Sequence, residues 1–75
     1  MEGGDRIIDC GKCLHIWMMR KNITNRELDE RLDKWLGYTA QKLHCKTMLL
    51  DNVGDICDAL GITIGNFFSV MDEVN

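Results

Sequence analysis

Residues 50–68 read LDNVGDICDALGITIGNFF and predict two amphipathic helices joined by a glycine turn. The first helix carries apolar side chains three and four residues apart, a spacing that places them on one helical face: Leu50, Val53, Ile56, Cys57 and Leu60. Gly61 then supplies a residue that readily takes the left-handed conformation of a helix end. Thr63 is a favoured N-cap residue and opens the next helix, whose apolar residues are Ile64, Phe67, Phe68, Met71 and Val74.

The N-terminal part of the chain predicts two more helices. Apolar residues recur at helical spacing between Ile7 and Met18, and the basic residues before Asn22 suit the negative end of a helix dipole. Thr24 and Glu27 have the spacing of a capping box, in which two side chains bond the free amides at a helix start. We therefore expect one helix to end near Asn22 and a second to begin at Thr24.

The polar middle of the chain predicts a short third helix. The second helix should run one turn further and stop at Gly37, because apolar residues follow one another at helical spacing along one face: Leu28, Leu32, Trp35 and Leu36. Thr39 can cap a third helix that reaches about Lys46, with Leu43 as its one strong core residue. Because no alternating strand pattern occurs in these segments, we expect an all-α protein.

Length and composition describe one small globular domain. The chain has 75 residues, of which 45% are hydrophobic and 28% charged, values typical of a folded protein. It lacks proline and any low-complexity linker, so we predict a single domain over residues 1–75, with an ordered core from about residue 6 to residue 72. No apolar run is long enough for a membrane span and the N-terminus lacks the features of a signal peptide, which favours a cytoplasmic location.

Two stretches carry a resemblance to a known family. Residues 16–32, IWMMRKNITNRELDERL, resemble the first two helices of Cro and phage-repressor-type helix-turn-helix proteins, the xenobiotic-response-element family. Residues 50–68 look like the fourth helix of that family, its Ala-Leu-Gly turn and the start of its fifth helix. The resemblance implies a compact five-helix, lambda-repressor-like helix-turn-helix domain. The chain departs from the family pattern in a longer second helix and in a shorter connection around residues 47–49.

The resemblance also implies a sequence-specific DNA-binding transcriptional regulator, a small phage or mobile-element repressor, and not an enzyme. In this family the third helix enters the major groove of duplex DNA and the start of the second helix meets the DNA backbone. Glutamine pairs well with adenine and lysine with guanine, and the predicted base-reading residues are Thr39, Gln41, Lys42 and His44. The predicted phosphate contacts are Asn25, Arg26, Tyr38 and Lys46.

One recognition helix reads only a few base pairs, so we expect a homodimer on a palindromic operator. The predicted dimer interface is the apolar face of the last helix, with Phe67, Phe68, Met71 and Val74. The net charge of -3 is unusual for a DNA-binding domain, but every charged residue from Asp51 onward is acidic, so the acidic surface can face away from DNA. The same acidity favours an alternative, a protein-binding helix-turn-helix module such as an antirepressor or a phage-encoded inhibitor.

Cysteine spacing raises the separate question of a metal site. Cys10 and Cys13 have C-x-x-C spacing, and His15 lies close by. A structural zinc site needs four ligands, and no second pair of ligands with such spacing follows. We therefore expect no metal, no cofactor and no catalytic residues, and thiols that are free, as is usual in a reducing cytosol.

Overall fold

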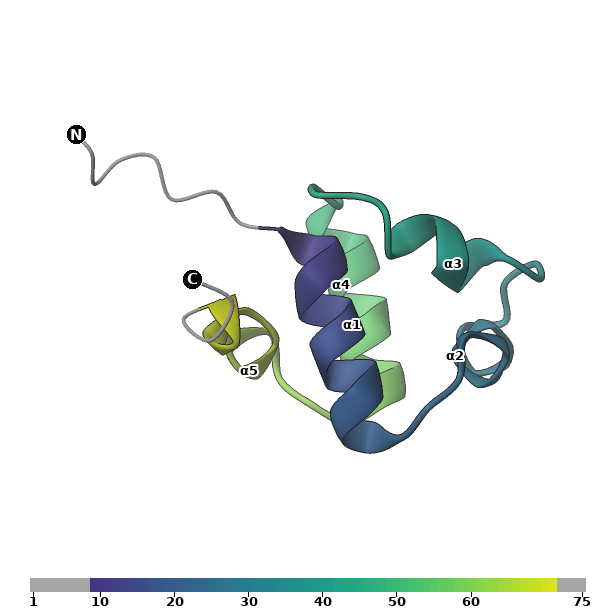
Figure 1. Cartoon of the computed structure of the whole chain (residues 1–75), viewed down its shortest axis with the longest axis horizontal. Coiled ribbons are helices and arrows are strands. Elements are labelled where there is room, and N and C mark those ends of the chain that lie inside the picture. Colours follow the sequence, from purple (N-terminus) through teal and green to yellow (C-terminus); the bar gives the residue numbers. More distant parts are fainter. Residues whose placement is uncertain (1–8, 72–75) are drawn as a thin grey trace.

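The computed structural model describes residues 9–71, which form five helices (Figure 1). They are α1 (Cys10–Lys21), α2 (Asn25–Leu32), α3 (Tyr38–Lys42), α4 (Leu50–Leu60) and α5 (Ile64–Ser69). These described residues form no strand, which confirms the all-α prediction. The predicted start of the first helix at Ile7, the outer limits of the ordered core and Val74 all lie outside the described residues.

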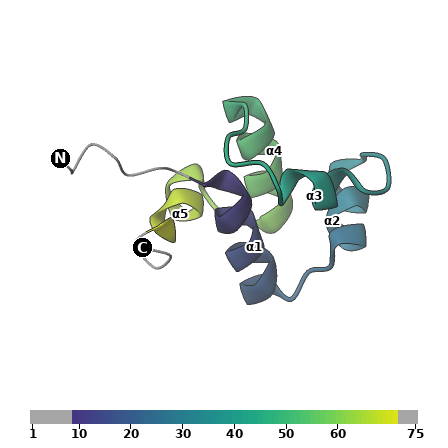
Figure 2. The ribbon, with the colours of Figure 1, turned by 45° about the horizontal axis from the view of Figure 1, so that its top comes forward.

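Helices α1 and α4 lie in the centre of the molecule, with α2 and α3 on one side and α5 on the other (Figure 1, Figure 2). Helix α4 connects the two sides, because it contacts α2 as well as α5. The core consists of Cys10, Cys13, Leu14, Met18, Leu28, Val53, Ile56, Cys57, Leu60, Phe67, Val70 and Met71. Helix α3, all of whose residues are described, contributes no buried apolar side chain to this core. No helix within residues 9–71 has the length and apolar character needed to cross a membrane.

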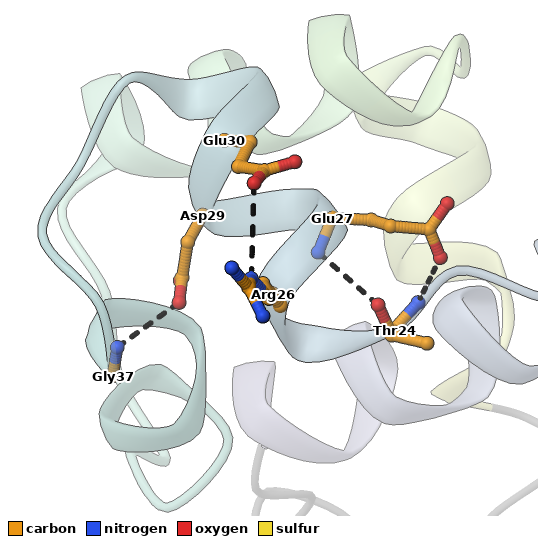
Figure 3. A network of polar contacts seen from close by, with 6 residues as sticks. All are labelled: Thr24, Arg26, Glu27, Asp29, Glu30 and Gly37. Carbon is orange, nitrogen blue, oxygen red and sulfur yellow. Dashed lines mark hydrogen bonds and ion pairs between the residues drawn. The ribbon is translucent and has the colours of Figure 1, made fainter.

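The threonine caps predicted from the sequence are present at α2 and α5. Thr24 Oγ1 accepts a hydrogen bond from the Glu27 amide at 3.1 Å, and the Glu27 carboxylate accepts one from the Thr24 amide at 3.0 Å (Figure 3). Thr63 and Asn66 form the equivalent pair at α5, with distances of 3.0 and 3.4 Å. Gly61 ends α4 in the left-handed region at φ 74°. The caps supply partners for amides that a helix start leaves unpaired.

The predicted length of the second helix is wrong, because α2 ends at Leu32 and not at residue 36. Asp33 takes a left-handed conformation (φ 57°), and the amides of Asp33 and Lys34 donate to carbonyls of the last helical turn. The chain then turns away from the core and leaves Trp35 57% and Leu36 77% exposed. Helical spacing had placed both of these side chains on the buried face.

Several smaller predictions are also corrected. Gly37 does not end α2; it precedes α3 in the left-handed region, at φ 99°. Helix α3 ends at Lys42, so the connection to α4 covers residues 43–49 and is longer than expected. Leu50 is 66% exposed and Ile64 40% exposed, because each lies in the first turn of its helix, beyond the edge of the core.

The start of α1 contacts the connection after α3. The amides of Cys10 and Gly11 donate to the carbonyls of Lys46 and Cys45, both at 2.8 Å. A Cβ atom on Gly11 would stand 2.8 Å from the Cys45 oxygen and still closer to the Leu43 oxygen, so only glycine fits this approach of two backbones. The contact fixes the path of the chain where it leaves α3.

Candidate nucleic-acid interface

The first turn of α2 holds two of the predicted phosphate contacts. Asn25 and Arg26 directly follow the Thr24 cap, and both are exposed. The Arg26 guanidinium lies 3.8 Å from the Glu30 carboxylate, and both side chains are largely exposed (Figure 3). An exposed ion pair of this kind contributes about 0–1 kcal/mol. It therefore holds Arg26 only weakly and leaves the guanidinium available to a phosphate.

A buried carboxylate joins α2 to α3. Asp29 is 3% exposed, and its oxygens accept hydrogen bonds from the Gly37 amide at 3.0 Å (Figure 3) and from the Thr39 amide at 2.7 Å. Burial by itself raises the pKa of Asp29, but hydrogen bonds from Thr39 and Gly37 outweigh burial and hold this pKa below its ordinary value. Asp29 therefore stays ionised at neutral pH and caps α3, because Gly37 has no side chain to do so.

The same carboxylate explains why α2 is short. An aspartate within α2 reaches the amides at the start of α3 only if the chain folds back directly after α2, and the left-handed Asp33 makes that turn. The bond from Thr39 to Asp29 joins residues ten positions apart. The spacing of apolar residues cannot reveal a hydrogen bond between residues so far apart in the sequence. It therefore predicted a second helix that was too long.

The prediction that Thr39 reads a base is wrong. Its side chain is fully buried, at 0% exposure. The cause is the short bond from its amide to Asp29, which turns the residue toward α2. The other predicted base readers remain accessible, since Gln41 and His44 are exposed and Lys42 is half-buried.

Tyr38 and Lys42 belong to a cluster at the corner between α2 and α3. The ring of Tyr38 is half-buried, with the Lys42 ammonium 5.2 Å and the Lys34 ammonium 5.5 Å from its centroid. The Trp35 ring meets the Tyr38 ring edge-on at a centroid distance of 5.8 Å. We call this cluster the aromatic tip; it consists of Lys34, Trp35, Leu36, Tyr38 and Lys42. The structure thus combines a predicted base reader and a predicted phosphate contact with an exposed tryptophan.

The remaining predicted contacts lie at the end of α3 and just after it. The carbonyl of Gln41 accepts hydrogen bonds from the His44 amide at 3.1 Å and the Cys45 thiol at 3.5 Å. These bonds keep Gln41 and His44 next to each other, and both side chains face solvent. Lys46 is also exposed, and its backbone carbonyl is held by the start of α1.

A groove that was not predicted from the sequence connects α1, the start of α2 and the end of α3. Its volume is about 250 Å³, and its walls are formed by His15, Met18, Met19, Asn22, Ile23, Thr24, Asn25 and Leu43. Because Asn25 and Leu43 border the same opening, the first turn of α2 and the end of α3 are neighbours at the surface. Asn25 is the one predicted DNA contact that lines the groove, and the predicted base readers lie outside it.

The C-x-x-C pair lies in the core. Cys10 is 5% exposed and Cys13 is 0% exposed, whereas His15 is exposed. Burial raises the pKa of both thiols, that of Cys13 to about 11, so both are protonated near neutral pH. All four cysteines are free thiols. Within residues 9–71 no three side chains of the types that bind metals come together.

The predicted dimer interface on the last helix is corrected as well. Phe67 is 0% exposed and Met71 is 7% exposed, because α5 packs against α1 and α4 and uses these side chains to fill the core of its own chain. Phe68 is half-buried and meets the Phe67 ring edge-on at 5.2 Å. Phe67 and Met71 are therefore not free to cover a second copy, Phe68 is only partly accessible, and Val74 lies beyond the described residues.

We compared the chain with models of protein families, with curated proteins and with solved structures, and none of the three comparisons gave a match. We therefore infer its function from the geometry and charge of the residues described above.

Proposed function

We propose that this chain is a sequence-specific DNA-binding regulator that contacts duplex DNA through α2, α3 and the corner between them. The observation that carries the proposal is that hydrogen bonds to Asp29, and not buried apolar side chains, fix the position of α3. Asp29 fixes the start of this helix, no apolar side chain of α3 is buried, and Gln41 faces solvent. A short helix that is fixed in place without forming part of the core is suited to presenting side chains to a partner.

The roles of the side chains follow from their chemistry and exposure. Gln41, Lys42 and His44 would read base edges, since amide, ammonium and imidazole groups hydrogen-bond the major-groove edges of bases. The phosphate contacts would be made by Asn25, Arg26, Tyr38 and Lys46. The resemblance of residues 16–32 and 50–68 to phage-repressor-type proteins supports the same assignment. A homodimer on a palindromic operator remains part of the proposal, with an interface other than the buried face of α5.

Charge limits the affinity that this interface can reach. The described residues carry as many acidic as basic side chains. The exposed acids of α4, Asp51, Asp55 and Asp58, lie on a helix for which no base contact is proposed. A few lysine and arginine side chains then supply the attraction to phosphate, and affinity should fall as salt rises.

Titration of labelled duplex DNA, followed by fluorescence anisotropy at two salt concentrations, tests the proposal. The protein should prefer DNA from upstream of its own gene over scrambled DNA and should bind less tightly at the higher salt. Gln41→Ala and Lys42→Ala should each lose about 1–3 kcal/mol of binding free energy and keep the helical circular dichroism signal. Lys12→Ala is a matched control, because it removes an exposed lysine of α1 outside the interface. Absence of binding at low salt would contradict the proposal.

A second candidate function is binding to another protein, and exposed leucines favour it. Leu49 is 74% exposed and Leu50 66% exposed at the start of α4. Two adjacent leucines would supply the apolar centre of a contact surface, and a stable partner would also have to cover the residues around them. If duplex DNA does not bind, Leu49→Ser and Leu50→Ser are the variants with which to map a protein partner.

A further inference from the structure

The aromatic tip contains two large apolar side chains that the fold does not use. Trp35 is 57% exposed and Leu36 is 77% exposed, and neither belongs to the core. Both precede α3, the helix proposed to read bases. The turn between α2 and α3, which carries Trp35 and Leu36, forms a corner at the edge of the molecule in two views (Figure 1, Figure 2).

The exposed indole is held in place although it is not buried. The Trp35 carbonyl accepts a hydrogen bond from the Tyr38 amide at 3.1 Å, and the two rings are in edge-on contact. A Cβ atom on Gly37 would lie 3.3 Å from the Trp35 ring, so the ring already covers the glycine backbone. Gly37 is itself fixed by Asp29. A side chain fixed in this way loses little conformational freedom when it binds a partner.

Two lysines beside the indole supply the positive charge that a nucleic acid requires, next to one exposed acid, Asp33. The ammonium groups of Lys34 and Lys42 both lie over the Tyr38 ring, next to Trp35. In complexes with single strands, proteins use cations beside an exposed aromatic ring to hold the phosphate backbone while a base stacks on the ring. In a duplex the same contact requires that a base step be partly unstacked. A stable protein interface buries about 800 Å² on each partner, and two apolar side chains flanked by lysines provide far less apolar surface.

We infer that Trp35 packs against a base of duplex DNA beside α3, while Lys34 holds the neighbouring phosphate and Lys42 reads the adjacent base edge. Leu36 then inserts, as an apolar wedge, between this base and its neighbour in the stack. Proteins that insert apolar side chains in this way partly unstack the step and kink the duplex. The inference rests on the proposed function, because it adds a stacking contact to the DNA-binding surface of α2 and α3.

The two tryptophans of the chain provide the test, because each can be made the only fluorophore of its kind. Trp17 is half-buried, and its indole donates a hydrogen bond to the Asn66 carbonyl at 3.2 Å. Trp17→Phe leaves Trp35 as the reporter, and Trp35→Phe leaves Trp17. On titration with duplex DNA, Trp35 emission should be quenched and should become protected from acrylamide, whereas Trp17 emission should not change.

Affinity measurements complete the test. Trp35→Ala should weaken binding to duplex DNA by about 5- to 150-fold, the range expected for loss of one stacked base, and Trp35→Phe should restore most of that loss. Leu49→Ala, which removes an apolar side chain that is 74% exposed outside the tip, should leave the affinity unchanged. Circular dichroism of each variant shows whether it has folded.

The outcomes separate the inference from the proposed function. If duplex DNA binds but Trp35 emission and the Trp35→Ala affinity do not change, the stacking contact is overturned and the proposed function stands. If single-stranded DNA binds and duplex DNA does not, both insertion into a duplex and the proposed function are overturned. If neither form of DNA binds, both the inference and the proposed function fail.

Discussion

Helices α3 and α5 are both short, but the rest of the molecule holds them by opposite means. Helix α5 is anchored by burial, with Phe67 fully enclosed and Val70 and Met71 buried just after the helix. Helix α3 has no buried apolar side chain and is anchored by the carboxylate of Asp29. The comparison indicates that burial builds the scaffold and a small set of polar bonds positions the candidate interface. Substitutions that remove these two anchors should therefore differ in how much they lower the free energy of unfolding and in which residues they affect.

Removing the anchor of α5 should have the largest effect. Phe67→Ala should lower the free energy of unfolding by about 3–5 kcal/mol, because it deletes a fully buried ring and leaves a cavity. Urea unfolding followed by circular dichroism measures this loss. Ile64→Ala on the same helix is the control, since Ile64 is 40% exposed and its truncation should cost less than about 1 kcal/mol. Equal losses in both variants would contradict the view that burial holds α5.

Removing the anchor of α3 should have a smaller and more local effect. Asp29→Ala should lower the free energy of unfolding by about 1–3 kcal/mol, because it leaves the amides of Gly37 and Thr39 without their partner. NMR amide shifts should change around α3 and remain unchanged in α5, and affinity for duplex DNA should fall. Glu30→Ala provides the comparison, as it removes an exposed carboxylate from the same helix. If the two variants behaved alike, Asp29 would have no special role.

Acid should weaken the anchor of α3 in a predictable range of pH. Because the folded-state pKa of Asp29 is lowered, its stabilising effect is complete above the unfolded-state pKa, near pH 4, and is lost as pH falls through the lower folded-state pKa. The difference in unfolding free energy between the wild type and Asp29→Asn should therefore be constant near neutral pH and shrink below about pH 4. Urea titrations across this range measure it. If the difference in unfolding free energy grew as the pH fell, the result would contradict a lowered folded-state pKa for Asp29.

The two threonine caps offer the smallest contrast. Thr24→Ala and Thr63→Ala should each cost about 1 kcal/mol, because each leaves an amide at a helix start unpaired. The two losses should be similar, because the hydroxyl bonds that the variants remove have similar lengths, 3.1 Å at Thr24 and 3.0 Å at Thr63. The bonds from the Thr24 and Thr63 amides to Glu27 and Asn66 remain in both variants, since alanine keeps its backbone amide. Thermal unfolding of the two variants compares them, and a loss at only one of the two sites would contradict the expectation.

Much of the scaffold was predictable because it follows local rules. Apolar spacing identified the buried residues Val53, Ile56 and Leu60 of α4, and the threonine patterns located the starts of α2 and α5. Leu50 and Ile64 were misplaced because helical spacing does not indicate where the core ends. The length of α2 was misjudged because a bond between Asp29 and residues of the next helix outweighs apolar spacing.

The candidate interface was less predictable than the scaffold. The exposure of Gln41 and His44 agrees with the sequence prediction, whereas the burial of Thr39 depends on a partner in another helix. Trp35 was placed on the apolar face of a longer second helix because of its spacing from Leu28 and Leu32. The one local signal was the glycine that follows it, since Gly37 allows both the left-handed turn and close contact with the indole.

The backbone contact at Gly11 has a consequence for the motions of α3. Asp29 holds the residues at the start of this helix, and the amides of Cys10 and Gly11 hold the segment that follows its end. A helix fastened at two points by a few hydrogen bonds opens without exposing the core, so its amides should exchange hydrogen through local openings well below the free energy of global unfolding. A ligand that contacts α3 then selects the closed state, and it slows exchange there without changing exchange in α4.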